Sequence, residues 1–225
     1  TTWMWSQFPG LGIGDSTSLD LFAAAARALQ DAHVPYGVTV FHHPDVVVDE
    51  GPCLSELDRY SVVIAAGVEC LSERQEAALE RFTARGGRLV TAGDFGTYTE
   101  DHVARTQPDL PVSPLESQQV AGLVGTSETS TARQDFVDAL GLGRDERLIR
   151  TNADPLVWCS LWERRGRRLD IHLVNYNMPS GALVPAEPFE IAVALPDGFS
   201  PSIGSLVGPD TPRREIEFNL EKNLA

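Results

Sequence analysis

The loop that contains Asp94, Phe95 and Tyr98 carries the residues most suited to chemistry. It directly follows an apolar run with the composition of a buried strand. Open α/β sheets bind their ligands beyond the carboxyl ends of such strands. Glu69 and Cys70 follow a second apolar run and supply another carboxylate and a thiol. The sequence therefore predicts a candidate cleft formed by these five residues.

None of the five is assigned a catalytic role. Cys70 precedes a helix cap at Ser72, and a helix N-terminus lowers the pKa of a thiol. Free cysteines are nevertheless among the most buried residues, so we expect Cys70 to pack inside the fold. Asp94 lies in a turn, where aspartate commonly fixes the loop. Residues 94–96 also spell the magnesium-binding tripeptide of protein kinases, but the other kinase motifs are missing.

The sequence predicts neither a metal site nor a bound cofactor. His42, His43, Asp45 and Asp49 are metal-ligand types. Adjacent residues of a strand point to opposite faces, however, so the two imidazoles do not reach one ion. The glycines at positions 10, 12 and 14 precede a helix without completing a dinucleotide-binding or nucleotide-triphosphate fingerprint.

The charge balance restricts the partners. The 18 basic and 32 acidic residues give a net charge of −14. Nucleic acids and anionic membranes attract clustered positive charge, so we expect neither as a partner. The basic cluster at residues 164–168 is too short to change this. Three widely spaced cysteines are typical of reduced thiols, which predicts a cytoplasmic protein.

Residues 1–145 alternate between helical and strand patterns, which predicts a doubly wound, mostly parallel α/β domain. Strands are predicted at 36–41, 61–66 and 88–92. A first helix is capped by Asp15 or Ser16 and ended by Pro35. Its predicted buried positions are Leu19, Phe22, Ala23, Ala26 and Leu29.

The helix between the last two predicted strands has the clearest signals. Ser72 and Gln75 form a capping-box pattern, and Gly86-Gly87 ends the helix. The predicted buried stripe is Leu71, Ala78, Leu79 and Phe82. A further helix is predicted over 131–140, before a stop at Gly141. Its inward residues are expected to be Phe136, Val137 and Leu140.

Residues 146–225 have the pattern of a small β-rich domain. The segments 156–163 and 168–176 are predicted to form a hairpin around Gly166, with Ile171 and Leu173 on its buried face. Further alternation is seen at 189–195 and 216–218. Three or four short strands are too few for a closed sandwich. Trp158 and Trp162 share one strand face, and that spacing favours packing over sugar stacking.

These segments resemble a known domain. The matching stretches are Leu57–Ile64, Cys70–Gln75, Phe82–Gly87 and Leu89–Gly93. They are similar to the β-galactosidase trimerisation domain of family 42-type glycoside hydrolases and of hypothetical glycosyl hydrolases. Ile171–Asn177 and Val193–Pro196 are similar to the β domain that follows it in those enzymes. The resemblance covers about residues 15–210.

The resemblance implies a flavodoxin-like fold of the class I glutamine amidotransferase type. Asp94 stands where amidotransferases carry the nucleophilic cysteine of a G-x-C-x-G turn. A carboxylate without an adjacent base does not perform thiolate acyl transfer. In the similar enzymes the catalytic glutamates belong to a preceding (β/α)8 barrel. We therefore expect this chain to be a non-catalytic piece of such a protein or a divergent stand-alone relative.

Three hypotheses follow from the sequence and the resemblance. The first is an accessory module that forms a homo-oligomer or associates with the barrel of its parent carbohydrate-active enzyme. The second is a sugar-binding or small-molecule-binding domain that uses the cleft at Gly93–Tyr98, with Glu100 beside it. The third is a stand-alone hydrolase that uses Asp94, Glu69 or Cys70.

Overall fold

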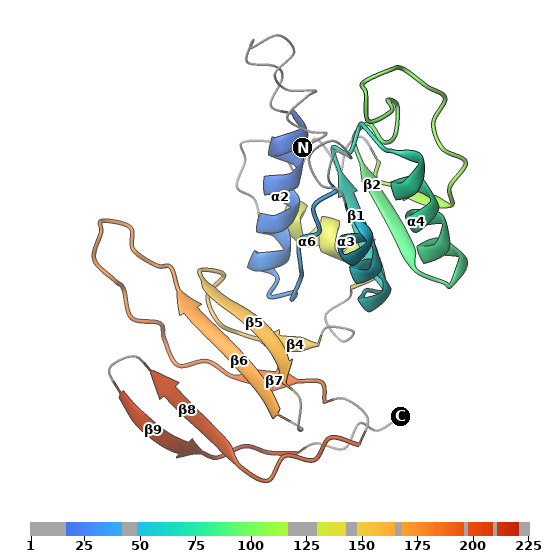
Figure 1. Ribbon diagram of the computed structural model, residues 1–225. Coiled ribbons are helices and arrows are strands. Elements are labelled where there is room, and N and C mark those ends of the chain that lie inside the picture. Colours follow the sequence, from blue (N-terminus) through green and yellow to red (C-terminus); the bar gives the residue numbers. More distant parts are fainter. Residues whose placement is uncertain are drawn as a thin grey trace.

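The computed structural model describes residues 17–41, 49–116, 130–142, 148–164, 168–195, 198–208 and 211–220. These residues form a mixed α/β structure with one three-stranded parallel sheet and three two-stranded antiparallel sheets. Figure 1 shows the helices grouped around the parallel sheet and the antiparallel strands in a region of their own. The predicted combination of a parallel sheet, helices and a β-rich C-terminal region is confirmed.

The parallel sheet has the strand order β1-β2-β3. Its strands are β1 (Val62–Ala66), β2 (Arg88–Ala92) and β3 (Val112–Pro114). The sequence predicted β1 and β2, and their parallel pairing places Ile64 opposite Val90. It did not predict β3, because three residues that include a proline carry no periodic signal.

Helices cover both faces of this sheet (Figure 1). On one face lie α3 (Gly51–Glu56), the 3₁₀ helix η2 (Leu57–Arg59) and α4 (Glu73–Ala84). On the other lie α2 (Thr17–Asp31) and α6 (Ser130–Ala139). Burial on both sides explains why β1 is continuously apolar rather than alternating.

Helix α4 begins and ends as predicted. The Oγ of Ser72 accepts a hydrogen bond from the backbone N–H of Gln75 at 3.2 Å, and the Gln75 side chain accepts one from the Ser72 N–H at 3.1 Å. Gly86 adopts a φ of +92°, and the next N–H, of Gly87, donates to the carbonyl of Phe82. The predicted stripe is confirmed, since Leu71, Ala78, Leu79 and Phe82 are at most 4% exposed.

Helix α2 turns a different face to the sheet than the one predicted. Phe22 is 42% exposed and Ala23 is also exposed, so their predicted burial is wrong. The buried residues are Leu21, Ala25, Ala28, Leu29 and Ala32. The four alanines at 23–26 are apolar all round the helix, and their periodicity therefore does not define one face. The predicted caps, Asp15 and Ser16, and the side chain of Leu19 lie outside the described residues.

The chain leaves α2 before Pro35. His33 has a φ of +55°, its N–H donates to Gln30, and the Val34 N–H donates to Leu29. This is the left-handed ending of a Schellman motif, in which His33 replaces the usual glycine. The predicted strand at 36–41 is wrong, because residues 34–41 form no strand. An alternating pattern becomes a strand only when a neighbouring strand pairs with it.

The C-terminal strands pair as three antiparallel ladders. The pairs are β4 (Ile149–Thr151) with β7 (Ile191–Val193), β5 (Val157–Arg164) with β6 (Arg168–Asn175), and β8 (Gly204–Gly208) with β9 (Thr211–Ile216). The β5–β6 hairpin confirms the prediction, although its turn at Gly166 lies outside the described residues.

Strand β5 contacts α2, and the His33 Nε2 lies 3.3 Å from the carbonyl of Ala153.

The register of β5 and β6 gives the hairpin two chemically different faces. The aromatic face comprises Trp158, Ser160, Trp162, Arg164, Arg168, Asp170, His172 and Val174, and it continues to Tyr176. The aliphatic face comprises Val157, Cys159, Leu161, Glu163, Leu169, Ile171, Leu173 and Asn175. The prediction that Ile171 and Leu173 are buried is wrong, because they are 38% and 37% exposed. These two side chains lie at the surface of the described structure.

Candidate functional site

The chain segments that leave β1 and β2 continue side by side beyond the sheet. The Gly96 N–H donates to the carbonyl of Val68 at 2.9 Å. Further on, the Tyr98 N–H donates to Glu69 and the Leu71 N–H donates to Tyr98, each at 3.0 Å. These bonds form a short parallel bridge between Cys70 and Tyr98. The two halves of the predicted cleft therefore meet through their backbones at the carboxyl end of the sheet.

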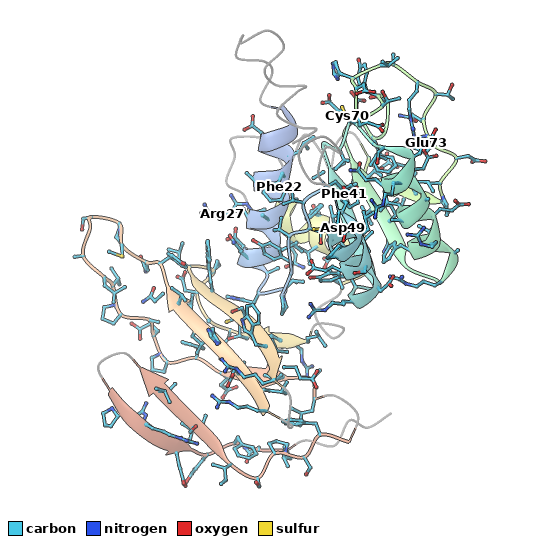
Figure 2. All side chains as sticks on the ribbon, in the orientation of Figure 1. Phe22, Arg27, Phe41, Asp49, Cys70 and Glu73 are labelled. Carbon is cyan, nitrogen blue, oxygen red and sulfur yellow. The ribbon has the colours of Figure 1, made fainter. Side chains whose placement is uncertain are left out.

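The five predicted side chains have different environments. Cys70 is 1% exposed, as expected for a packed thiol. Phe95 is 6% exposed and belongs to the core between the sheet and α4. Asp94 is exposed, whereas Tyr98 and Glu69 are half-buried. Figure 2 shows Cys70 where β1 leads into α4.

The sequence did not reveal the side chain that touches Cys70. The Sγ of Cys70 lies 3.7 Å from Nδ1 of His102, 32 positions further along the chain. The imidazole also stacks on Tyr98, with 4.4 Å between ring centroids and 18° between ring planes. His102 follows a candidate loop by only a few residues, which is the one signal that pointed to it. Its contact with Cys70 depends on the path of the loop, which no motif specifies.

A tight turn directs His102 toward the thiol. The Thr99 N–H donates to the carbonyl of Val103, and the His102 N–H donates back to the Thr99 carbonyl at 3.0 Å. The Oγ1 of Thr99 accepts a further hydrogen bond from the Val103 N–H. Within this turn His102 has a φ of +60°, in the left-handed region that side chains rarely adopt. The turn holds the imidazole over Tyr98.

Arg105 fastens the end of the same loop to helix α4. Its Nε donates to the carbonyl of Gly96 at 3.2 Å, and its Nη2 lies 2.6 Å from Oε2 of Glu76. Both side chains are less than a third exposed. A charge-assisted hydrogen bond in such a setting is shorter and stronger than a neutral one. Arg105 therefore limits how far the loop moves away from Cys70.

The electrostatic environment keeps the thiol protonated. Burial is the main cause that raises the pKa of Cys70 to about 11, and the charge of Glu69 adds to it. A protonated thiol carries no charge, so the contact is not an ion pair of a thiolate with an imidazolium; the imidazole tautomer decides which of the two groups donates. Nucleophilic cysteines instead need a lowered pKa and access for the substrate. This thiol and imidazole are in contact without being activated.

No group of three or more His, Cys, Asp or Glu side chains capable of holding a metal occurs among the described residues. His42, His43 and Asp45 lie outside them. Asp49 is described, and its Oδ1 accepts from the Gly51 N–H at 2.9 Å and lies 3.6 Å from Arg74. Asp49 thus has a structural role at the start of α3.

Comparison with protein-family models, with curated proteins and with solved structures gave no match to this chain. None of the described helices has the length and apolar character needed to cross a bilayer.

Proposed function

We propose that this chain is a non-catalytic accessory module of a carbohydrate-active enzyme of the β-galactosidase type, and that its work is subunit association. It associates with a second copy of itself or with the (β/α)8 barrel of its parent protein. The observation that carries the proposal is the large amount of apolar side chain that the C-terminal strands leave exposed. Exposed apolar surface marks interaction sites in many proteins.

The exposed apolar side chains occur from β6 to the end of the described chain. They include Ile171, Leu173, Leu183, Ile203, Leu206, Val207, Ile216, Phe218 and Leu220, which are 37–66% exposed. By contrast, the residues between β1 and α4 build a well-buried core. A two-stranded ladder is at best marginally stable without cover on one face. An associating surface that covers these strands would supply the missing cover.

The proposal includes a flavodoxin-like domain at residues 1–145 and a smaller β domain at 146–225. The parallel pairing of β1 with β2 and of β2 with β3 supports the first of these assignments. The helices on both faces of that sheet also support it, because this is the layering of doubly wound folds.

The environment of the predicted cleft supports a non-catalytic role. The amidotransferase-like position holds Asp94, whose side chain is exposed. The nearest thiol, Cys70, is buried and has a raised pKa. The free thiols of Cys53, Cys70 and Cys159 also support a reducing compartment, and we place the protein in the cytoplasm.

Light scattering coupled to size-exclusion chromatography tests the association. We expect a defined oligomer, and we expect the double variant Ile171→Ser/Leu173→Ser to shift it toward the monomer, because both changes make the aliphatic face polar. Val103→Ser is the matched control, since Val103 is 60% exposed on a loop of the α/β region. Circular dichroism checks that each variant is folded. A wild-type chain that stays monomeric at all concentrations, and that binds no barrel of its parent protein, contradicts the proposal.

A second candidate is small-molecule or sugar binding at the cleft. The observation that favours it is the stacked Tyr98–His102 pair next to the exposed Asp94. Calorimetric titration with galactosides and other sugars tests this candidate. If the cleft binds sugars, Tyr98→Ala should reduce the heat of binding. If no sugar gives a heat of binding, this candidate function is wrong.

A further inference from the structure

Large rings on the aromatic face of the β5–β6 hairpin are exposed, whereas residues 157, 159 and 161 on the opposite side of β5 are buried or half-buried. Trp162 is 60% exposed, Tyr176 is 48% exposed, and His172 is also exposed. On the aliphatic face Val157 is only 3% exposed, and Cys159 and Leu161 are half-buried. Large rings are usually buried because they carry much apolar area. Trp158 is half-buried, but the exposure of Trp162 shows that the predicted packing of this ring is wrong. The exposure of Trp162 and Tyr176 therefore needs an explanation.

The rings form two pairs on this face. Trp158 and Tyr176 have centroids 4.2 Å apart, and Trp162 and His172 have centroids 6.3 Å apart. The two tryptophans are four residues apart on one strand, which at about 3.3 Å per residue separates them by roughly 13 Å. An elongated ligand with flat apolar faces can reach both pairs along the direction of β5.

Polar groups lie beside the rings. Asp170, which is opposite Trp162 in the register, lies 2.6 Å from Arg164 and 2.5 Å from Arg168. The Trp162 Nε1 lies 3.3 Å from the Oγ of Ser160. The two guanidinium groups and the carboxylate hold one another in place. The Arg164 and Arg168 side chains are 64% and 69% exposed and offer donors at the edge of an aromatic platform, whereas the Asp170 side chain, 12% exposed, holds them in position.

We propose that the aromatic face binds a saccharide chain built of neutral pyranose units. One face of a pyranose ring exposes C–H bonds that stack on aromatic rings, while its hydroxyl groups lie at the ring edge. The arrangement of Trp162 beside Asp170 and the two arginines matches both properties. This site is separate from the Cys70 cleft and does not depend on the proposed association through the aliphatic face.

Two other occupants fit less well. The core of a protein–protein interface is depleted in aspartate, whereas Asp170 lies directly opposite Trp162. Single-stranded nucleic acid also stacks on aromatic rings, but it requires a positively charged groove. Both arginines are paired with Asp170, and the whole chain carries a net charge of −14. A neutral ligand avoids this repulsion.

Affinity electrophoresis of the full chain tests the proposal. The gels contain soluble galactan, xylan, mannan or mixed-linkage β-glucan, and calorimetry with matching oligosaccharides measures the affinity. We expect at least one polysaccharide to retard the chain. Trp162→Ala should weaken that binding roughly tenfold, because one stacked ring is removed. Trp162→Phe should restore most of it, since a ring is again present.

Phe22→Ala is the matched control, because Phe22 is an aromatic ring that is 42% exposed on α2 and not on the hairpin. It should bind as the wild type does. The site is overturned if no polysaccharide retards the chain or if Trp162→Ala binds as tightly as the wild type. The proposal is also overturned if the chain binds a dT oligonucleotide and none of the polysaccharides. Light scattering shows whether Trp162→Ala keeps the oligomeric state of the wild type. It thus distinguishes loss of saccharide binding from loss of association, which the aliphatic face controls.

Discussion

The Sγ of Cys70 lies 3.7 Å from Nδ1 of His102, on a segment that crosses beyond the end of β2. The thiol is 1% exposed, and the ring of Tyr98 stacks on the imidazole. Because burial raises the pKa of the thiol to about 11, the thiol is protonated at neutral pH. The first two predictions test this relationship.

The folded chain should lose stability as the pH rises from about 9 to about 11. The thiol of Cys70 keeps its proton in the folded state up to a pKa of about 11, whereas the ordinary value is 9.0. Between these values the unfolded chain binds fewer protons, so the free energy of unfolding falls by on the order of 2 kcal/mol. Below pH 9 the thiol is protonated in both states, and its contribution is constant. Denaturant unfolding of the wild type and of Cys70→Ala measures the difference.

Cys70→Ala removes the titrating group, and its stability should therefore depend less on pH in this range. Cys159→Ala is a useful comparison, because burial also raises the pKa of that thiol and Cys159 lies in the C-terminal hairpin. If the free energy of unfolding depends on pH in the same way in the wild type and in Cys70→Ala, the thiol is not buried as described.

Arg105→Ala should increase the alkylation rate of Cys70. The substitution removes the hydrogen bond to Gly96 and the ion pair with Glu76, which hold the loop that carries His102. We expect a several-fold faster reaction with iodoacetamide, measured by mass spectrometry on the peptide that contains Cys70. Arg81→Ala, on the exposed side of α4, is the control and should leave the rate unchanged. An unchanged rate in Arg105→Ala would mean that Arg105 does not restrain the loop.

Leu21→Ala should destabilise the chain much more than Phe22→Ala, although phenylalanine is the larger residue. Leu21 is 2% exposed and Phe22 is 42% exposed. We expect about 2–5 kcal/mol for the buried leucine and less than about 1 kcal/mol for the exposed ring. Thermal or denaturant unfolding measures both. The opposite order would show that α2 buries the face first predicted from the sequence.

Ser72→Ala should lower the free energy of unfolding by about 1 kcal/mol, because it removes the acceptor for the Gln75 N–H at the start of α4. Glu73→Ala, one residue later on an exposed position, should cost less. Hydrogen exchange of the first turn of α4 should accelerate only in Ser72→Ala. Equal protection in both variants would indicate that the capping box contributes little.

Local sequence signals were sufficient where neighbours along the chain decide the structure. The cap at Ser72, the glycine stop at Gly86 and the apolar run of β1 were each predicted from a few adjacent residues. These features depend on hydrogen bonds within one helix or on continuous burial of one strand. The burial of Phe136 in α6 follows from the same kind of periodicity.

The tertiary structure decided what depends on contacts between distant residues. The alanine-rich α2 has no face that its own periodicity defines, and its packing against α6 and the sheet selected Leu21 over Phe22. The contact of Cys70 with His102 arises because a loop returns across two strand ends, over 32 positions of sequence. Such loop paths follow from many weak contacts acting together, which no single residue pattern encodes. The sequence by itself therefore determined the elements and their caps, and the fold alone determined which of their side chains meet.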